Sequence, residues 1–129
     1  MLKKEVGDQV FYPELSFAIM EIAFEIHNII GPGFTENIYE EAFVYELANR
    51  QMPFEQQKPI EVFYKGLCVG FYRLDFLVDQ KIIVELKAVS ALNDLYKQQV
   101  NSYLKATGLR LGLLINFGSK RLEHVRIVH

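Results

Sequence analysis

Three charged residues of this chain occupy positions where the surrounding pattern would place apolar side chains. Asp75 lies in one apolar segment, and Glu85 and Lys87 lie in the next, residues 82–87. Because side chains alternate between the two faces of a β-strand, Glu85 and Lys87 point to the same side. Residues 82–84 are apolar on both faces, which indicates a strand that is covered on both sides. Charges on a covered face need partners or a metal ion.

An acid on one strand and an acid-x-lysine sequence on the next suit the metal-dependent hydrolysis of phosphodiesters. Asp75, Glu85 and the backbone carbonyl of Leu86 offer hard oxygen ligands for Mg²⁺ or Mn²⁺. Such an ion polarises a phosphoryl oxygen and lowers the pKa of a bound water. Lys87 would stabilise the developing charge or position the attacking water. On chemistry alone, an ordinary strand pair with a stray salt bridge stays open as the alternative.

The two acids can share a site only if they meet on one face of the sheet. In an antiparallel pair, Asp75 lies opposite Glu85 if the polar residues 79–81 form a three-residue loop, which is a common hairpin length. A two-residue loop would instead place Asp75 opposite Val84 and separate the acids. The predicted site therefore depends on the longer loop.

A predicted helix at residues 92–107 carries a glutamine that is a further candidate site residue. Leu92, Tyr96, Gln99 and Tyr103 fall on one stripe of this helix. A glutamine inside such a stripe needs a partner if it is buried. Gln99 is then either a satisfied core amide, a residue at a wetter helix edge, or a residue that orients metal-bound water or substrate beside Lys87.

Two further residues are weaker candidates when they are taken alone. Glu36 opens a predicted helix just after Gly31-Pro32-Gly33, and Tyr39 shares its face one turn later. A glutamate in a first helical turn is usually a surface acid that the helix dipole favours. His27 lies on the apolar arc of the preceding helix, where a histidine is more often a satisfied core residue than a ligand.

The elements that must position these residues follow from the periodicity of apolar side chains. Helices are predicted at residues 15–30 and 36–51, with Thr35 as the N-cap of the second. Strands are predicted at residues 55–58, 60–65, 69–78, 81–88, 111–117 and 122–128, and the helix 92–107 is a crossover. This order predicts an α/β fold, a mixed sheet flanked by helices, in a single domain over residues 1–129.

Composition narrows the class of protein further. Half of the residues are hydrophobic and 13% are aromatic, as in a globular chain. Residues 1–8 contain no apolar run of the kind found in signal peptides, and no stretch is long enough for a membrane helix, so we expect a cytoplasmic protein without membrane contact. The single cysteine, Cys68, excludes an internal disulfide. A net charge of −2 does not by itself indicate a nucleic-acid-binding protein.

Together these residues resemble the PD-(D/E)XK nuclease superfamily. Asp75 followed by Glu85-Leu86-Lys87 matches its defining motif, here without the proline before the aspartate, and residues 99–103 resemble the QxxxY element of RecB-like members. The chain is also similar to the GxxExxY proteins, whose motif corresponds to Gly33-Phe34-Thr35-Glu36-Asn37-Ile38-Tyr39. Further blocks of likeness lie at residues 25–33, 72–75, 84–89, 103–110 and 112–118.

The resemblance implies roles for residues by position. Asp75 and Glu85 would be metal ligands and Lys87 the catalytic lysine. Glu36 would contribute an acid from its helix, and His27 would be a further ligand. Gln99 and Tyr103 would shape the site from the third helix, beside Tyr39 of the GxxExxY motif. Tyr96 departs from the histidine that relatives often carry three residues before the glutamine.

The leading hypothesis is a Mg²⁺- or Mn²⁺-dependent nuclease that acts on DNA. A non-catalytic nucleic-acid-binding or accessory module that keeps the same fold is the alternative, because such domains can lose activity while the fold persists. A phosphodiesterase directed at RNA or nucleotides is a third option. A chain of 129 residues offers little surface to grip a duplex alone, so a homodimer or a partner protein is expected.

Overall fold

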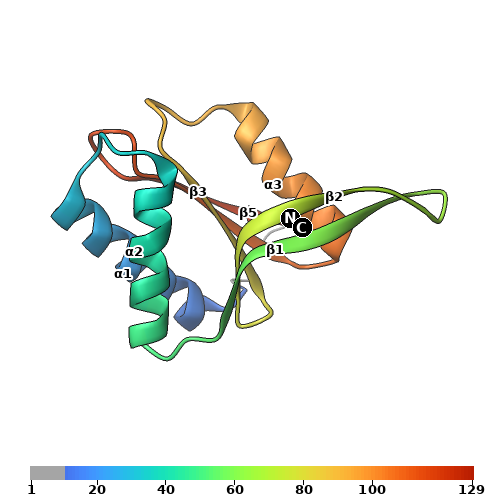
Figure 1. Ribbon diagram of the computed structural model, residues 1–129, viewed down its shortest axis with the longest axis horizontal. Coiled ribbons are helices and arrows are strands. Elements are labelled where there is room, and N and C mark those ends of the chain that lie inside the picture. The colour runs from blue at the N-terminus through green and yellow to red at the C-terminus, as the bar shows by residue number, and fades with distance from the viewer. Residues whose placement is uncertain (1–10) are drawn as a thin grey trace.

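The computed structural model of the protein describes residues 11–129, and the expectation about a signal peptide at residues 1–8 lies outside the described residues. A mixed five-stranded sheet carries helices on both faces, which confirms the predicted α/β fold (Figure 1). The elements are α1 (Pro13–Ile30), α2 (Glu36–Asn49), β1 (Phe54–Tyr64), β2 (Leu67–Val78), β3 (Ile82–Lys87), α3 (Asp94–Thr107), β4 (Leu111–Asn116) and β5 (Glu123–Val128). None of the helices among the described residues has the length and apolar character that a bilayer crossing requires.

The strands lie in the order of the chain, β1-β2-β3-β4-β5. β1, β2 and β3 pair antiparallel, α3 then crosses over so that β3 and β4 pair parallel, and β5 returns antiparallel. Phe76 pairs with Val84 and Val78 with Ile82, so the turn between β2 and β3 has the three-residue loop that the site requires. The register prediction is therefore confirmed.

Two differences from the predicted elements have local causes. The expected strands at 55–58 and 60–65 are one continuous strand, because the edge strand β1 tolerates Pro59, whose missing N–H faces no neighbour that needs it. Gln57 has a left-handed backbone (φ 53°) and drops out of the paired register, which makes a local irregularity in β1. α3 begins at Asp94 and not at residue 92, because the Asn93 side chain caps it by accepting a hydrogen bond from Tyr96 N.

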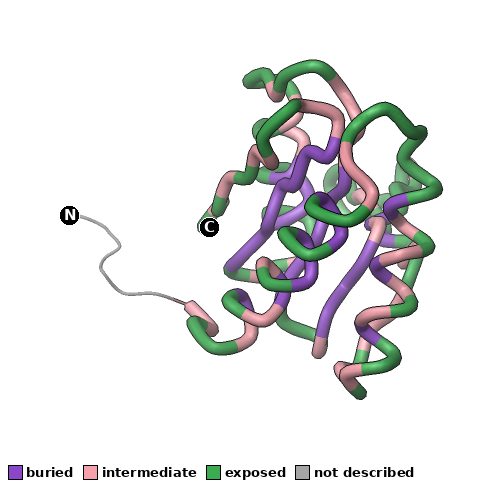
Figure 2. The backbone as a smooth tube through the Cα atoms, turned by 90° about the vertical axis from the view of Figure 1, so that its left-hand side faces the viewer, coloured by how far each residue is buried: buried purple, intermediate pink, exposed green. Residues whose placement is uncertain are grey.

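The two faces of the sheet carry separate cores. α1 and α2 cover the face that bears Phe76, Val84 and Ile115, while α3 covers the face that bears Leu74 and Ile83. β3 and β4 lie between the two cores and are almost wholly buried (Figure 2). Alternate residues of β3 therefore face different helices, and Glu85 and Lys87 share their face with Ile83, toward α3.

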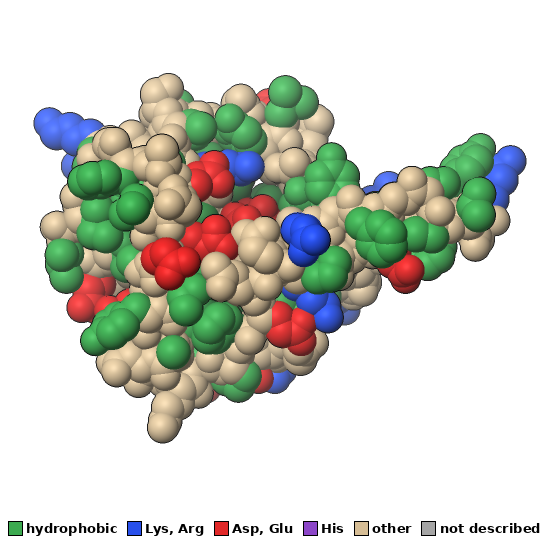
Figure 3. All heavy atoms as spheres, viewed as in Figure 1, with side chains coloured by type: hydrophobic (Ala, Val, Ile, Leu, Met, Phe, Trp, Pro, Cys, Tyr) green, Lys and Arg blue, Asp and Glu red, His purple; other side chains and the backbone are tan. Residues whose placement is uncertain are grey.

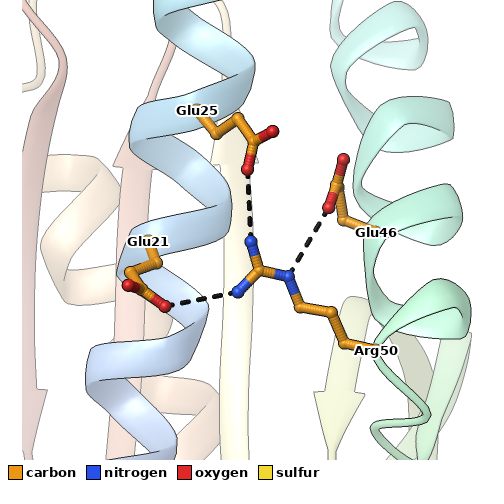
Figure 4. A network of polar contacts seen from close by, with 4 residues as sticks. All are labelled: Glu21, Glu25, Glu46 and Arg50. Atoms are coloured by element: carbon orange, nitrogen blue, oxygen red, sulfur yellow. Dashed lines mark hydrogen bonds and ion pairs between the residues drawn. The ribbon is translucent and has the colours of Figure 1, made fainter.

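A four-residue charge network joins the first two helices at the surface. Arg50, just after α2, lies 3.3 Å from Glu21 and 3.2 Å from Glu25 of α1, and 3.5 Å from Glu46 of α2 (Figure 4). These groups are partly exposed, so each contact contributes little on its own. Apolar packing of α1 and α2 beneath the network supplies most of the stability.

The backbone after β4 passes very close to the backbone after β3. A Cβ built on Gly118 would lie 2.4 Å from both the N and the O atom of Val89. No side chain fits there, so glycine is required at this position. The close approach of Gly118 to Val89 joins the two chain segments two residues beyond the ends of β4 and β3.

We expect Gly118→Ala to lower the melting temperature by roughly 3–12 °C. The added methyl must displace backbone, and overpacking of this kind costs roughly 1–3 kcal/mol, with each kcal/mol worth about 3–4 °C at this chain length. The matched control is Gly70→Ala, whose Cβ would meet no atom within 4 Å. Thermal unfolding followed by circular dichroism compares the two, and equal melting temperatures would contradict the tight contact.

Candidate active site

Asp75 and Glu85 each accept a hydrogen bond from the backbone of the opposite strand, at the point where the backbone pairing between β2 and β3 ends. The Leu86 N–H donates to Asp75 Oδ2 at 2.8 Å, and the Asp75 N–H donates to Glu85 Oε2 at 2.8 Å. The paired register stops at Phe76 and Val84, so these side-chain bonds take over where the backbone bonds stop. Asp75 and Glu85, which the sequence indicated as a pair, are thus brought together.

Both carboxyl groups are held in a setting that disfavours negative charge. Glu85 is only 4% exposed. Burial raises the pKa of Glu85 to about 8, and the neighbouring charge of Asp75 adds to this rise. Burial likewise raises the pKa of Asp75 to about 6, although the bond from the Leu86 N–H opposes the rise. The site therefore carries an excess of acid that lacks enough positive charge to balance it.

Lys87 stands beside the acid pair and is held from α3. Its Nζ lies 3.5 Å from Gln99 Oε1 and 4.8 Å from the centre of the Tyr96 ring. Among residues 11–129, Lys87 forms no ion pair within 4 Å with either acid. The predicted proximity of Gln99 and Lys87 is confirmed, and Tyr96 acquires a role as the aromatic face on which the ammonium rests.

Glu36 and Tyr103 complete the surroundings of the acids. Glu36 lies in the first turn of α2, and its charge contributes to the raised pKa of both Asp75 and Glu85. Tyr103 is 6% exposed on α3. Burial raises the pKa of Tyr103, and the charge of Glu85 raises it further, so its hydroxyl stays protonated and able to donate.

Two polar residues join this site that sequence reasoning missed. Gln57 Nε2 donates to Glu40 Oε2 at 2.7 Å and lies 3.5 Å from Asp75 Oδ1. Glu40 could have been found, because it lies one helical turn after Glu36 and shares its face. Gln57 carried no such signal, since the left-handed backbone that turns it toward Asp75 breaks the alternation of the strand.

Asn116 is a further residue that the sequence analysis missed. It fixes the chain segment that follows β3. Its side chain is fully buried, accepts from Val89 N at 2.9 Å and donates to Val89 O at 3.0 Å. Nδ2 also donates to Glu123 Oε1 at 2.8 Å, and that oxygen accepts from Leu92 N. A lone asparagine in the apolar run 111–117 was the available signal, because a buried amide must find partners.

The structure shows one set of contacts for each of His27 and Tyr39. His27 Nε2 lies 2.9 Å from the Ser119 carbonyl oxygen, so this nitrogen joins α1 to the segment after β4, and its role as a metal ligand stays a prediction. The Tyr39 ring stacks on Phe117 at 4.6 Å, and its hydroxyl donates to Gly31 O. Tyr39 thus holds the loop that leads to Glu36, a partner that the helical spacing alone did not reveal.

The donor set fits a divalent cation of the magnesium type. Within residues 11–129, no group of three or more His, Cys, Asp or Glu side chains converges as a ready-made metal cage. Mg²⁺ does not need one, since it keeps several waters and is usually held by one or two carboxylates. Figure 3 shows acidic side chains gathered in a hollow in the middle of the molecule, between the helical body and the β1–β2 hairpin. Excess negative charge in a hollow is the setting that such an ion would neutralise.

In metal-free buffer we expect the free energy of unfolding to fall as the pH rises from about 4.5 to about 8. The raised pKa values mean that the folded chain binds protons which the unfolded chain has released, so stability is lost as the pH rises through the folded values. Asp75→Asn should flatten this dependence, since it removes a neighbouring charge. Thermal unfolding across pH tests this, with Asp79→Asn in the adjacent loop as control, and equal slopes would contradict it.

Comparison with known proteins places this chain in a family. The model of the PD-(D/E)XK nuclease superfamily matches residues 13–127. The crystal structure of SSO0001 is similar with a TM-score of 0.54 at 19% identity, over 92% of this chain and 57% of that one, which shows a shared fold. The chain thus spans little more than half of that protein, and no curated protein matches it. Since the family model covers nearly the whole chain and the mixed sheet agrees with it, the chain belongs to the PD-(D/E)XK nuclease superfamily.

Proposed function

We propose that this protein is a Mg²⁺- or Mn²⁺-dependent nuclease that hydrolyses phosphodiester bonds of DNA. The observation that carries the proposal is the pair of Asp75 and Glu85, each of which accepts a hydrogen bond from the other's strand. Glu85 is buried and Asp75 half-buried, both have raised pKa values, and neither forms an ion pair among the described residues. Asp75, Glu85 and the Leu86 carbonyl would hold the cation. When bound, the cation polarises the phosphoryl group and acidifies a water.

The other residues supply positioning and charge. Lys87 is kept beside the acids by Gln99 and the Tyr96 ring, so its ammonium is available to the negative charge that develops on the phosphoryl oxygens. Gln99 can orient the attacking water with its amide. The Tyr103 hydroxyl stays protonated and can donate a hydrogen bond to a phosphate oxygen. Glu36 adds an acid from the first turn of α2.

We also propose that the chain is one of the GxxExxY proteins. The geometry supports a structural role for the glycine and the tyrosine of that motif. Gly33 has φ 116°, which favours glycine. Phe34 N donates to the Tyr39 hydroxyl, and that hydroxyl donates to Gly31 O. The glycine and the tyrosine therefore set the loop, and the loop places Glu36 at the start of α2.

We expect Lys87→Ala to reduce metal-dependent cleavage by at least about 100-fold, because removing one electrostatic stabiliser of a transition state has an effect of this size. The measurement is cleavage of labelled single- and double-stranded DNA, with matched RNA, in Mg²⁺ or Mn²⁺. Lys81→Ala is the matched control, since this lysine pairs with Asp79 in the adjacent loop. Faster cleavage of RNA would redirect the substrate assignment, and equal rates for the two variants would contradict the role of Lys87.

Metal binding is a separate expectation that does not need the right substrate. Mn²⁺ at about 100 times its dissociation constant should stabilise the wild-type protein by about 2.7 kcal/mol. Asp75→Asn and Glu85→Gln should lose most of this gain, while Asp79→Asn keeps it. Thermal unfolding with and without Mn²⁺ gives the comparison. Metal binding without any cleavage would favour the non-catalytic module, and no stabilisation of the wild type would sink the proposal.

A further inference from the structure

We infer that a cavity beside the acid pair binds an unpaired nucleobase, so that the substrate class is single-stranded nucleic acid. The inference rests on the proposed nuclease function and deepens it. The cavity holds about 290 Å³ and lies between the β1–β2 hairpin and α3. Its walls are formed by Ile60, Val62, Tyr72, Gln99, Ser102, Tyr103 and Ala106.

The chemistry of the walls is that of a base-stacking site. The Tyr72 and Tyr103 rings lie 5.5 Å apart and are tilted by 52° to each other. Tyr72 is 54% exposed, so one part of its ring is free to receive another aromatic surface. Ile60 and Val62 of β1 add apolar contact. Stacking on an aromatic side chain tolerates every base, because each base has a π face.

Polar groups on the α3 side connect the cavity with the acid pair. Gln99 lines the cavity and also lies 3.5 Å from Lys87 Nζ. Tyr103 lines it and also feels the charge of Glu85. A nucleotide whose base fills the cavity therefore has its own backbone next to the charged residues. Gln99 and Ser102 supply an amide and a hydroxyl for the edge of the base.

A second hollow continues the first along α3 and β1. It holds about 430 Å³ and shares Val62, Ser102 and Ala106 with the base cavity. Phe63, which is 59% exposed, and Lys105 extend it, with Glu61 on its rim. An aromatic ring and a lysine in series suit the next base and phosphate of a strand. The two hollows form a track that leads to the acid pair.

Duplex nucleic acid cannot use this track without unpairing. A paired base keeps its faces in the stack, and extruding it costs a few kcal/mol. A single strand carries no such cost. The net charge of −2 also favours a mode of binding that relies on stacking as well as on phosphate contacts.

The test measures binding of the full chain in EDTA, so that cleavage does not interfere. The probe is a short single-stranded oligonucleotide with one 2-aminopurine, and the comparison is its blunt duplex. The chain contains no tryptophan, so the fluorescence of the probe base is read against a low background. Variants are Tyr72→Ala and Tyr72→Phe, and the matched control is Tyr64→Ala at the exposed hairpin tip, outside both hollows.

We expect the wild type to bind the single strand at least about tenfold more tightly than the duplex, and Tyr72→Ala to weaken binding and probe quenching by about tenfold. Tyr72→Phe and Tyr64→Ala should stay within about twofold of the wild type. Ala106→Leu, at an exposed helix position that accepts leucine, fills the cavity from the other side and should weaken binding as well. This second variant decides the matter if Tyr72→Ala does not fold.

Equal binding of single strand and duplex, or wild-type binding by both cavity variants, would overturn the inference. Binding that depends on Tyr72 without metal-dependent cleavage would support the base site while the nuclease proposal fails. Metal-dependent cleavage that is unchanged in the Tyr72 and Ala106 variants would support the nuclease proposal while the base site fails. The two proposals are therefore separable in one set of proteins.

Discussion

The placement of a buried and a half-buried carboxyl group at the point where β2 and β3 part is the constraint on which the rest of the structure depends. Asp75 and Glu85 replace the ladder bonds beyond Phe76 and Val84 with bonds to each other's strand. This holds the strands together while leaving acid uncompensated, which is unfavourable in a protein core. Such an arrangement destabilises the folded state by itself, and a bound cation would offset this cost by compensating the negative charge. The fold tolerates the cost because β3 and β4 are buried on both faces beside it.

The elements around the acids divide the work between the two faces of the sheet. α3 brings Gln99, Tyr96 and Tyr103 to the face of Glu85 and Lys87. On the other face, α2 adds the charges of Glu36 and Glu40 near Asp75, while α1 contacts the segment after β4 through His27. Asn116 and the close approach at Gly118 fix the backbone just after Lys87, and so they fix the end of β3 that carries this lysine. Preorganisation of this kind is what lets a charged group stabilise a transition state.

Much of the fold and the acidic centre could be predicted from the sequence, because strand alternation and loop length are local rules. The three-residue loop alone placed Asp75 beside Glu85, and one helical stripe placed Gln99 beside Lys87. The remainder depended on contacts between distant segments. Gln57 reaches the site through a backbone conformation that no strand pattern reveals. The contact of His27 could not be predicted, because the Ser119 carbonyl beside its Nε2 is 92 residues away in the chain.

The irregular edge of β1 has a consequence for how this molecule behaves among its copies. A regular outer strand offers a row of unpaired N–H and C=O groups, on which a strand from another chain can assemble. Here Pro59 has no N–H to offer, Gln57 turns away from the sheet direction, and Lys58 places a charge between them. Growth of the sheet across this edge is therefore blocked beside the acidic hollow. The same irregularity that delivers Gln57 to Asp75 therefore interrupts the addition of a strand along this part of the β1 edge.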